Sequence, residues 1–134
     1  METSPSGVTV DGDADSKPSI TVPQSDPPSD LEITDLIVGD GDEVAPGATV
    51  TTHYVGVSWS TNKQFDASWD RGQPISFPLS GVIAGWTQGI PGMRVGGRRL
   101  LVIPSSLGYG QAGAGADIGP GETLVFAVDL VATR

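Results

Sequence analysis

Residues 49–59 read Thr-Val-Thr-Thr-His-Tyr-Val-Gly-Val-Ser-Trp, a run rich in threonine, valine and tyrosine. Residues of these types favour the pleated backbone of a β-strand. Because side chains alternate along a strand, Val50, Thr52 and Tyr54 share one of its faces. This stretch therefore predicts a strand, and the segments on either side of it predict the sheet to which the strand belongs.

Four other segments have an alternating or strongly apolar pattern, namely 31–38, 75–79, 98–103 and 124–130. The first runs into Gly39-Asp-Gly-Asp, which is typical of a turn, so we expect an edge strand there. Pro78 has no backbone N–H to donate and therefore indicates an edge strand or a bulge at 75–79. These segments predict an antiparallel sheet of about five strands.

One short segment has helical spacing. Val82, Ile83, Trp86 and Ile90 recur at intervals of three and four residues and would share a helix face. We expect the helix to begin at Ser80 or Gly81 and to end at Gly89. The predicted fold class is therefore α+β, with one sheet whose apolar face wraps around a single short helix.

Residues 1–30 differ in composition from the rest of the chain. They hold five prolines, six serines and six acidic residues, with a net charge of −5. Their large apolar residues, Val8, Val10, Ile20 and Val22, are too few to offset an ordering cost of about 1–2 kcal/mol per residue. We expect a flexible tail over 1–30 and a folded domain over 31–134. The alternation of Ser19-Ile-Thr-Val22 leaves open an extra strand packed on that domain.

Charge and composition exclude several classes of function. The net charge is −9, with 7 basic and 16 acidic residues, so binding to nucleic acid or to an anionic membrane surface is disfavoured. The chain has no cysteine and one histidine, His53, which excludes thiol chemistry and histidine-rich metal sites. No apolar run reaches the roughly 18–20 residues of a spanning helix. We expect no metal, no cofactor and a monomer.

The cellular location is less constrained by the sequence. The N-terminus has neither a basic segment nor an apolar segment of the kind found in signal peptides. As given, the chain is expected in the cytoplasm. An exported or lipid-tethered mature form stays open if an upstream signal was removed.

Aromatic residues in unlike contexts suggest a binding pocket. Tyr54 lies in a strand, Trp86 in the helix and Phe126 in the final strand. Any one of them fits an ordinary core. Asp66 directly beside Phe65, and Tyr109 between two glycines, fit a core less well and indicate polar groups aimed into an apolar cavity.

These residues carry a resemblance to a known family. The runs Val50-Thr-Thr-His-Tyr-Val-Gly56, Phe65-Asp-Ala-Ser68, Val82-Ile-Ala-Gly-Trp86, Gly108-Tyr-Gly110 and Thr123-Leu-Val-Phe126 occur in consistent order over residues 31–134. Together they resemble the FKBP family, the peptidyl-prolyl cis-trans isomerases that bind tacrolimus and rapamycin, and in particular its bacterial single-domain members. The resemblance implies a half-barrel of five or six antiparallel strands around one short helix.

The resemblance also implies roles for individual residues. Trp86 would lie under the proline ring, and Asp66 and the Tyr109 hydroxyl would be the polar groups of the pocket. The Ile83 backbone N–H would donate to the substrate carbonyl, and Arg71 would pair with Asp66. Apolar walls would come from Tyr54, Phe65, Ile75, Phe77, Val82, Ile118 and Phe126. We expect Asp66, Tyr109, Ile83, Trp86 and Phe126 to carry catalysis, on proline-containing polypeptides and without a cofactor.

The chain departs from the family pattern at the rim of the pocket. Ile75 stands where many members have an aromatic residue, Leu107 replaces a tyrosine, and Ala114-Gly115 stands where well-known members have His-Pro. The departures affect the expected binding of protein substrates and partners more than catalysis. A non-catalytic module that grips proline-containing segments in the same pocket is the alternative function.

Overall fold

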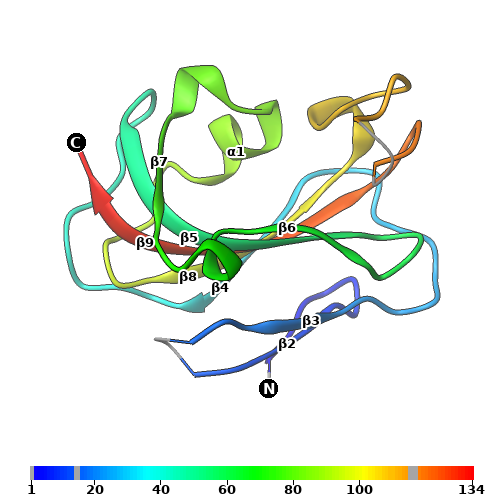
Figure 1. Cartoon of the computed structure of the whole chain (residues 1–134), viewed down its shortest axis with the longest axis horizontal. Helices are drawn as coiled ribbons and strands as arrows, with labels where there is room; N and C mark the ends of the chain where they lie inside the picture. Colours follow the sequence, from blue (N-terminus) through cyan, green and yellow to red (C-terminus); the bar gives the residue numbers. More distant parts are fainter. Residues whose placement is uncertain (1, 14–15, 115–117) are drawn as a thin grey trace.

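The computed structural model describes residues 2–13, 16–114 and 118–134. These residues form three layers, with a six-stranded sheet in the middle (Figure 1). The helix α1 lies over one face of this sheet, and a smaller three-stranded sheet lies over the opposite face. We call the face toward α1 the inner face and the other the outer face.

The central sheet is antiparallel, as the sequence predicted. Its strands run in the order β4, β8, β9, β5 and β6, and β7 also pairs with β5. Their bounds are β4 (Glu32–Ile37), β5 (Thr49–Ser58), β6 (Gln64–Ala67), β7 (Ile75–Pro78), β8 (Arg98–Ile103) and β9 (Leu124–Thr133). The α+β fold class is confirmed, and the edge positions of β4 and of the proline-containing β7 follow the prediction.

The long strand β5 pairs with three other strands of the central sheet. It pairs with β9 from Val50 opposite Thr133 to Ser58 opposite Leu124. On its other side β5 pairs first with β7 and then with β6. No strand residue pairs with His53 or Tyr54 on that side, within the described part of the chain. The 3-10 helix η1 (Ser68–Arg71) lies against β5 there.

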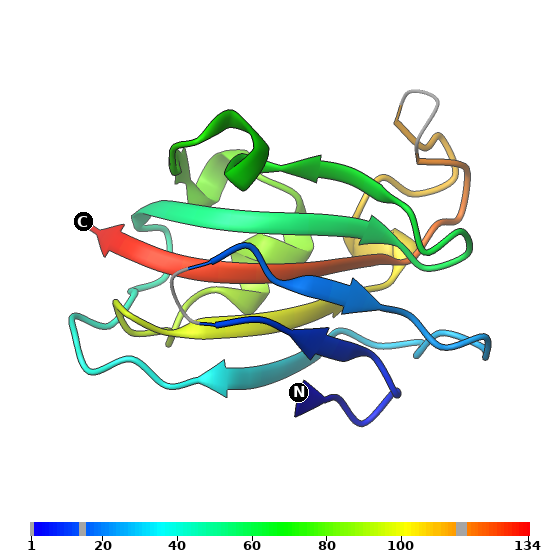
Figure 2. The same cartoon turned by 60° about the horizontal axis from the view of Figure 1, so that its bottom comes forward.

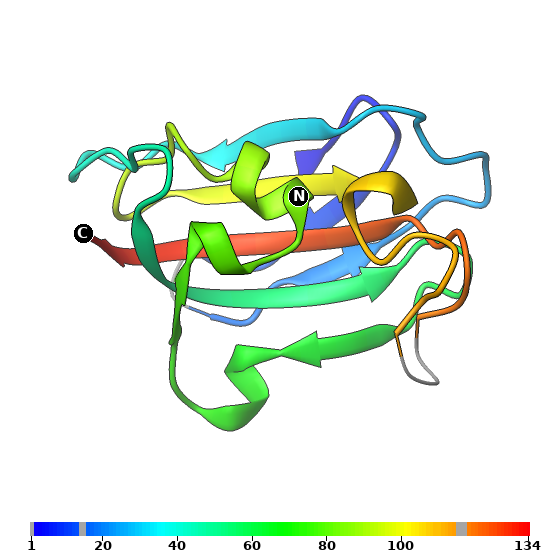
Figure 3. The same ribbon diagram turned by 90° about the horizontal axis from the view of Figure 1, so that it is seen from above.

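The helix is shorter than the spacing predicted. α1 spans Ala84–Gly89, and a separate 3-10 turn, η2, covers Leu79–Gly81. Between them Val82 and Ile83 have extended ψ angles of 174° and 150°, which interrupt the helical backbone. Figure 3 shows α1 and these turns over the inner face of the sheet. No helix in the described ranges is long and apolar enough to cross a membrane.

The structure differs from the expectation of a flexible tail at residues 1–30. This segment forms a three-stranded antiparallel sheet, the N-terminal meander, with strands β1 (Glu2–Thr3), β2 (Thr9–Asp11) and β3 (Ser19–Thr21). Figure 2 shows it lying across the outer face of the central sheet. Its buried residues pack against Val55, Val57, Ala67, Leu100, Val102, Val125 and Ala127.

The physical reason for the difference is the partner surface. The large apolar residues of the meander are only 0–8% exposed, because they pack against the apolar outer face of the central sheet as well as against one another. They are Val8, Val10, Ile20 and Val22. Polar contacts add to this packing. The buried Arg98 of β8 pairs with Asp129 at 2.7 Å and donates to the carbonyl oxygen of Ser16 at 2.9 Å.

Candidate functional site

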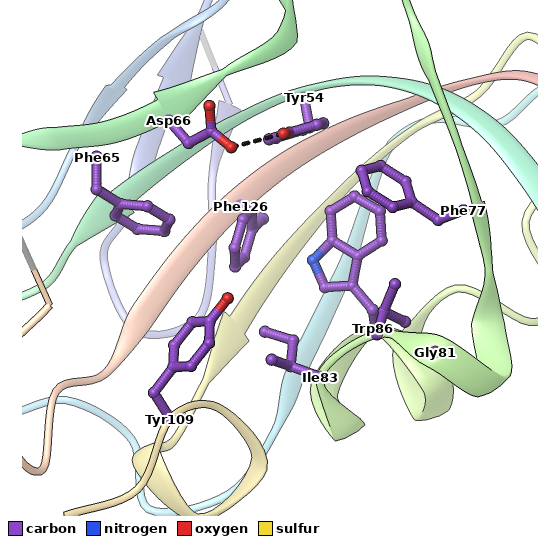
Figure 4. A pocket seen from close by; sticks show the side chains of 10 residues that line it. Tyr54, Phe65, Asp66, Phe77, Gly81, Ile83, Trp86, Tyr109 and Phe126 are labelled. Carbon is purple, nitrogen blue, oxygen red and sulfur yellow. Dashed lines mark hydrogen bonds between the residues drawn. The ribbon is translucent and has the colours of Figure 1, made fainter. Parts of the chain in front are cut away.

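A cavity of about 470 Å³ opens between the inner face of the sheet and α1. Figure 4 shows residues that surround it, which come from β5, β6, β7, the end of η2 and the turn that follows it, α1, the segment after η3 (Ser105–Leu107) and β9. Its lining residues are Tyr54, Phe65, Asp66, Phe77, Gly81, Val82, Ile83, Trp86, Tyr109 and Phe126. The cavity therefore draws on segments that are far apart in the sequence.

Aromatic rings that meet edge to face form its floor and walls. Trp86, which is 4% exposed, has its ring centroid 5.5 Å from those of Tyr54 and Phe126, at interplanar angles of 86° and 88°. Phe77 contacts Trp86 at 5.4 Å, and Phe65 contacts Phe126 at the same distance. Such T-shaped pairs are the favoured aromatic arrangement, so the rings fix one another's orientation.

The rings of Phe65 and Phe126 pack directly against the backbone of Gly56 in β5. A Cβ atom built on Gly56 would lie 2.6 Å from the ring of Phe65 and 2.8 Å from that of Phe126. Any side chain there would push both rings into the cavity. The glycine in the β5 sequence is therefore required by the close approach of these two rings.

One rim of the cavity holds three hydrogen-bonded polar groups, which we call the rim triad: Tyr54, Asp66 and Arg71. The Tyr54 hydroxyl donates to Asp66 Oδ2 at 2.6 Å (Figure 4), and Arg71 Nη1 donates to Asp66 Oδ1 at 2.7 Å. Arg71 Nη2 also donates to the Tyr54 hydroxyl oxygen at 2.8 Å. The three groups form a closed ring of hydrogen bonds contributed by β5, β6 and η1.

This ring determines the protonation of its members. Burial raises the pKa of Tyr54 to about 12, and the adjacent Asp66 carboxylate adds to the rise. Burial alone would raise the pKa of Asp66, but hydrogen bonds from Tyr54 and Arg71 outweigh it and hold that pKa below its ordinary value. At neutral pH the triad is therefore a neutral phenol, a carboxylate and a guanidinium.

The turn before α1 presents a backbone donor to the cavity. The Ile83 carbonyl accepts from Trp86 N–H, but Ile83 N–H has no hydrogen-bond partner among the described residues. The extended backbone at Val82 and Ile83 leaves this donor outside the helix. Across the cavity the Tyr109 hydroxyl points inward (Figure 4) and has no hydrogen-bond partner among the described residues. Both groups are available to a ligand.

Nine of the twelve residues expected to line the pocket surround this cavity. The other three lie elsewhere. Arg71 pairs with Asp66 without lining the cavity, Ile118 belongs to the buried core cluster that contains Trp86, and Ile75 packs against that cluster. Of the rim departures, Ala114 forms an isolated bridge with Ile118, and Gly115 lies outside the described residues. The catalytic and binding roles of all twelve remain predictions.

Sequence reasoning missed two features of the site. Gly81 lines the cavity but was considered only as the start of the helix. Tyr54 was expected as an apolar wall, whereas its hydroxyl joins the rim triad. A signal existed for the second feature, since Tyr54 was expected to be buried and a buried phenol usually finds a polar partner.

Comparison with known proteins gives a consistent result. Residues 41–131 match the sequence profile of the family described as FKBP-type peptidyl-prolyl cis-trans isomerase. A "Probable FK506-binding protein" of Corynebacterium glutamicum is 55% identical over 115 residues, which are 86% of this chain and 97% of the relative. An "FK506-binding protein" of Streptomyces anulatus is 55% identical over 119 residues, 87% of this chain and 96% of that protein.

A solved structure is also similar. The crystal structure of a peptidyl-prolyl cis-trans isomerase from Pseudomonas syringae superposes with a TM-score of 0.71 at 38% identity. The superposition covers 78% of this chain and 75% of that one. The likeness therefore extends over most of both chains.

Proposed function

Because the chain belongs to the family of FKBP-type peptidyl-prolyl cis-trans isomerases, we propose that the aromatic cavity over Trp86 is the place where X–Pro bonds rotate. The observation that carries this proposal is the cavity's composition. Aromatic rings enclose it, and the Ile83 N–H and the Tyr109 hydroxyl face it without a partner in the described chain. In the cell, the corresponding role is to accelerate prolyl isomerisation during protein folding.

The reaction requires little from the protein in chemical terms. Rotation about an X–Pro bond takes tens to hundreds of seconds unassisted, against the barrier of about 18–20 kcal/mol that amide resonance imposes. No covalent bond is made or broken, so no nucleophile is needed. A thousandfold acceleration corresponds to about 4 kcal/mol of preference for the twisted state over the planar one.

The cavity supplies that preference through its polarity. In the twisted state, amide resonance is lost and the carbonyl is less dipolar than in the planar ground state. Transfer from water into an enclosure of aromatic rings is less unfavourable for the twisted, less dipolar state than for the planar state. The cavity therefore lowers the free-energy difference between the two states. The proline ring would lie on Trp86, and the Ile83 N–H would hold a substrate carbonyl in one orientation.

The rim triad would keep the polar edge of the cavity fixed during the rotation. Its carboxylate already accepts hydrogen bonds from Tyr54 and Arg71, and its pKa is below the ordinary value, so it is a poor proton acceptor at neutral pH. Asp66 therefore acts as an orienting charge rather than as a general base.

Macrolide binding forms the finer part of the proposal. The cavity of about 470 Å³ is within the range of small-molecule sites and is lined mainly by apolar groups. The relatives named for FK506 binding support the same ligand class for this chain. Tacrolimus and rapamycin would occupy the place of the proline-containing segment and compete with it.

The test is the exchange rate of a short X–Pro peptide, measured by NMR with and without the protein. We expect catalysed exchange, fastest with a bulky apolar residue before proline, and inhibition by rapamycin at a one-to-one ratio. Phe65→Ala should slow exchange, whereas Val131→Ala, at an exposed site on β9, should not. Exchange at the uncatalysed rate, together with peptide binding, would favour the non-catalytic module instead.

A further inference from the structure

Ser68, the first residue of η1, lies outside the cavity and is hydrogen-bonded to the backbone of Tyr54. Its side chain is wholly buried, at 0% exposure. The Tyr54 N–H donates to Ser68 Oγ at 2.6 Å, and Ser68 Oγ donates to the Tyr54 carbonyl oxygen at 3.4 Å. His53 Nδ1 lies 2.9 Å from Ser68 Oγ.

These contacts replace a missing strand. On this side of β5, the pairing with β7 ends at Thr52 and the pairing with β6 begins at Val55. The N–H and carbonyl groups of Tyr54 point into the gap between the two pairings. Leaving such buried backbone groups without a partner would be costly, and the Ser68 hydroxyl satisfies both.

The same hydroxyl fixes the position of η1. This short helix spans four residues, and Arg71 is its last residue. Arg71 reaches Asp66 and the Tyr54 hydroxyl with two different nitrogens, so its fork fits only one placement of η1. The stacking of His53 on Trp69, at 3.9 Å between ring centroids, supports η1 from the outer side.

We propose that Ser68 is a positioning residue for the isomerase reaction, which acts by holding β5 and η1 in the register that closes the rim triad. The proposal rests on the proposed function of the cavity. It differs from a purely structural role in one respect. Loss of the Ser68 hydroxyl would disturb the hydrogen bonds of Asp66, although Ser68 does not line the cavity and its hydrogen bonds go to His53 and Tyr54.

The test compares Ser68→Ala with a matched control, Thr52→Val. Thr52 lies two residues from Tyr54 on β5, is also wholly buried, and its hydroxyl has no hydrogen-bond partner in the described part of the chain. Thr52→Val therefore removes a buried hydroxyl from the same strand without touching η1. Ser68→Thr restores the hydroxyl and serves as the rescue variant.

Two quantities are measured on the folded protein. The first is kcat/KM for a short X–Pro peptide, which should fall about tenfold in Ser68→Ala, the effect of about 1.4 kcal/mol on a rate. The second is the pKa of the Asp66 carboxyl, followed by its 13C chemical shift. This pKa should rise toward its ordinary value in Ser68→Ala as Arg71 moves away, and should return to its starting value in Ser68→Thr.

The two measurements separate the possible failures. Unchanged kcat/KM and an unchanged Asp66 pKa in folded Ser68→Ala would overturn the proposal, and so would equal effects in Thr52→Val. A raised Asp66 pKa with unchanged kcat/KM would overturn the part concerning the reaction. If the wild-type protein does not catalyse exchange at all, the proposed function fails, and the Asp66 titration still decides whether Ser68 positions the rim triad.

Discussion

Shortening Val8 to alanine tests whether the N-terminal meander is part of the folded core. Val8 directly precedes β2 and is fully buried, in the apolar cluster that the meander forms with the outer face of the central sheet. The substitution removes about two methylene equivalents at roughly 0.8 kcal/mol each and leaves a small cavity. We expect a loss of about 2 kcal/mol in the free energy of unfolding, whereas a flexible tail predicts no loss.

The assay combines thermal unfolding with amide hydrogen exchange. For a chain of this size, about 2 kcal/mol corresponds to a fall of about 6–10 °C in the unfolding midpoint. The amides of Thr9 and Val10, whose strand pairs with β3 on one side and β1 on the other, should be protected in the wild type and exchange faster in the variant. Thr21→Ala, at an exposed position of β3, is the matched control and should change neither quantity.

One result would refute this reasoning. If Thr9 and Val10 exchange in the wild type at the rate of an unstructured peptide, and Val8→Ala unfolds at the wild-type midpoint, the meander does not pack on the sheet. A flexible tail would also predict that a chain starting near Pro28 keeps its stability, whereas a packed meander predicts a loss. Such a truncation would uncover the outer-face residues that the meander buries.

Three further predictions concern the inner face. Phe126→Ala should lower stability by about 3–5 kcal/mol and also lower kcat/KM, because the ring is both core and cavity wall; denaturant unfolding and peptide exchange measure the two effects. Gly85→Ala should destabilise by about 1–3 kcal/mol in thermal unfolding despite alanine's better helix propensity, since its Cβ would lie 2.5 Å from the buried Ile103 side chain. The pH profile of kcat/KM should be flat from about pH 7 to 9, because the pKa of Tyr54 is raised to about 12 and that of Asp66 is lowered. Activity, and the small stabilisation from the exposed Asp66–Arg71 pair, should be lost only as the pH falls through the lowered pKa of Asp66; a loss that begins near neutral pH would contradict this assignment.

The features that the sequence predicted well are those in which neighbouring residues carry the signal. Alternation along 124–130 placed Phe126 on the inner face, and the spacing of Trp86 and Ile90 placed both on one side of a helix. The helix start was wrong because Val82 and Ile83 are apolar and fit a helical pattern, although their backbone is extended. Spacing alone does not distinguish a helical residue from one that reaches the same surface from the turn before the helix.

The N-terminal meander was missed because its stability depends on a surface elsewhere in the chain. The burial of four apolar residues, Val8, Val10, Ile20 and Val22, is too small by itself to offset the free-energy cost of ordering residues 1–30. A signal for the partner surface was present in β8 and β9. Leu100-Leu-Val-Ile103 and Leu124-Val-Phe-Ala-Val128 are continuous apolar runs, which indicate strands buried on both faces. A sheet with one open face does not need them.

The two faces of β5 have different consequences for function. Tyr54 points to the cavity, while Val55 and Val57 pack beneath the N-terminal meander. Substitutions on the outer face should therefore change stability with little effect on the catalytic rate of the folded protein. The ion pair between Lys17 and Asp70, at 2.8 Å, joins the meander to η1 next to Arg71. Because both side chains are substantially exposed, this ion pair is worth little, and we expect the buried Ser68 rather than this ion pair to control the placement of η1.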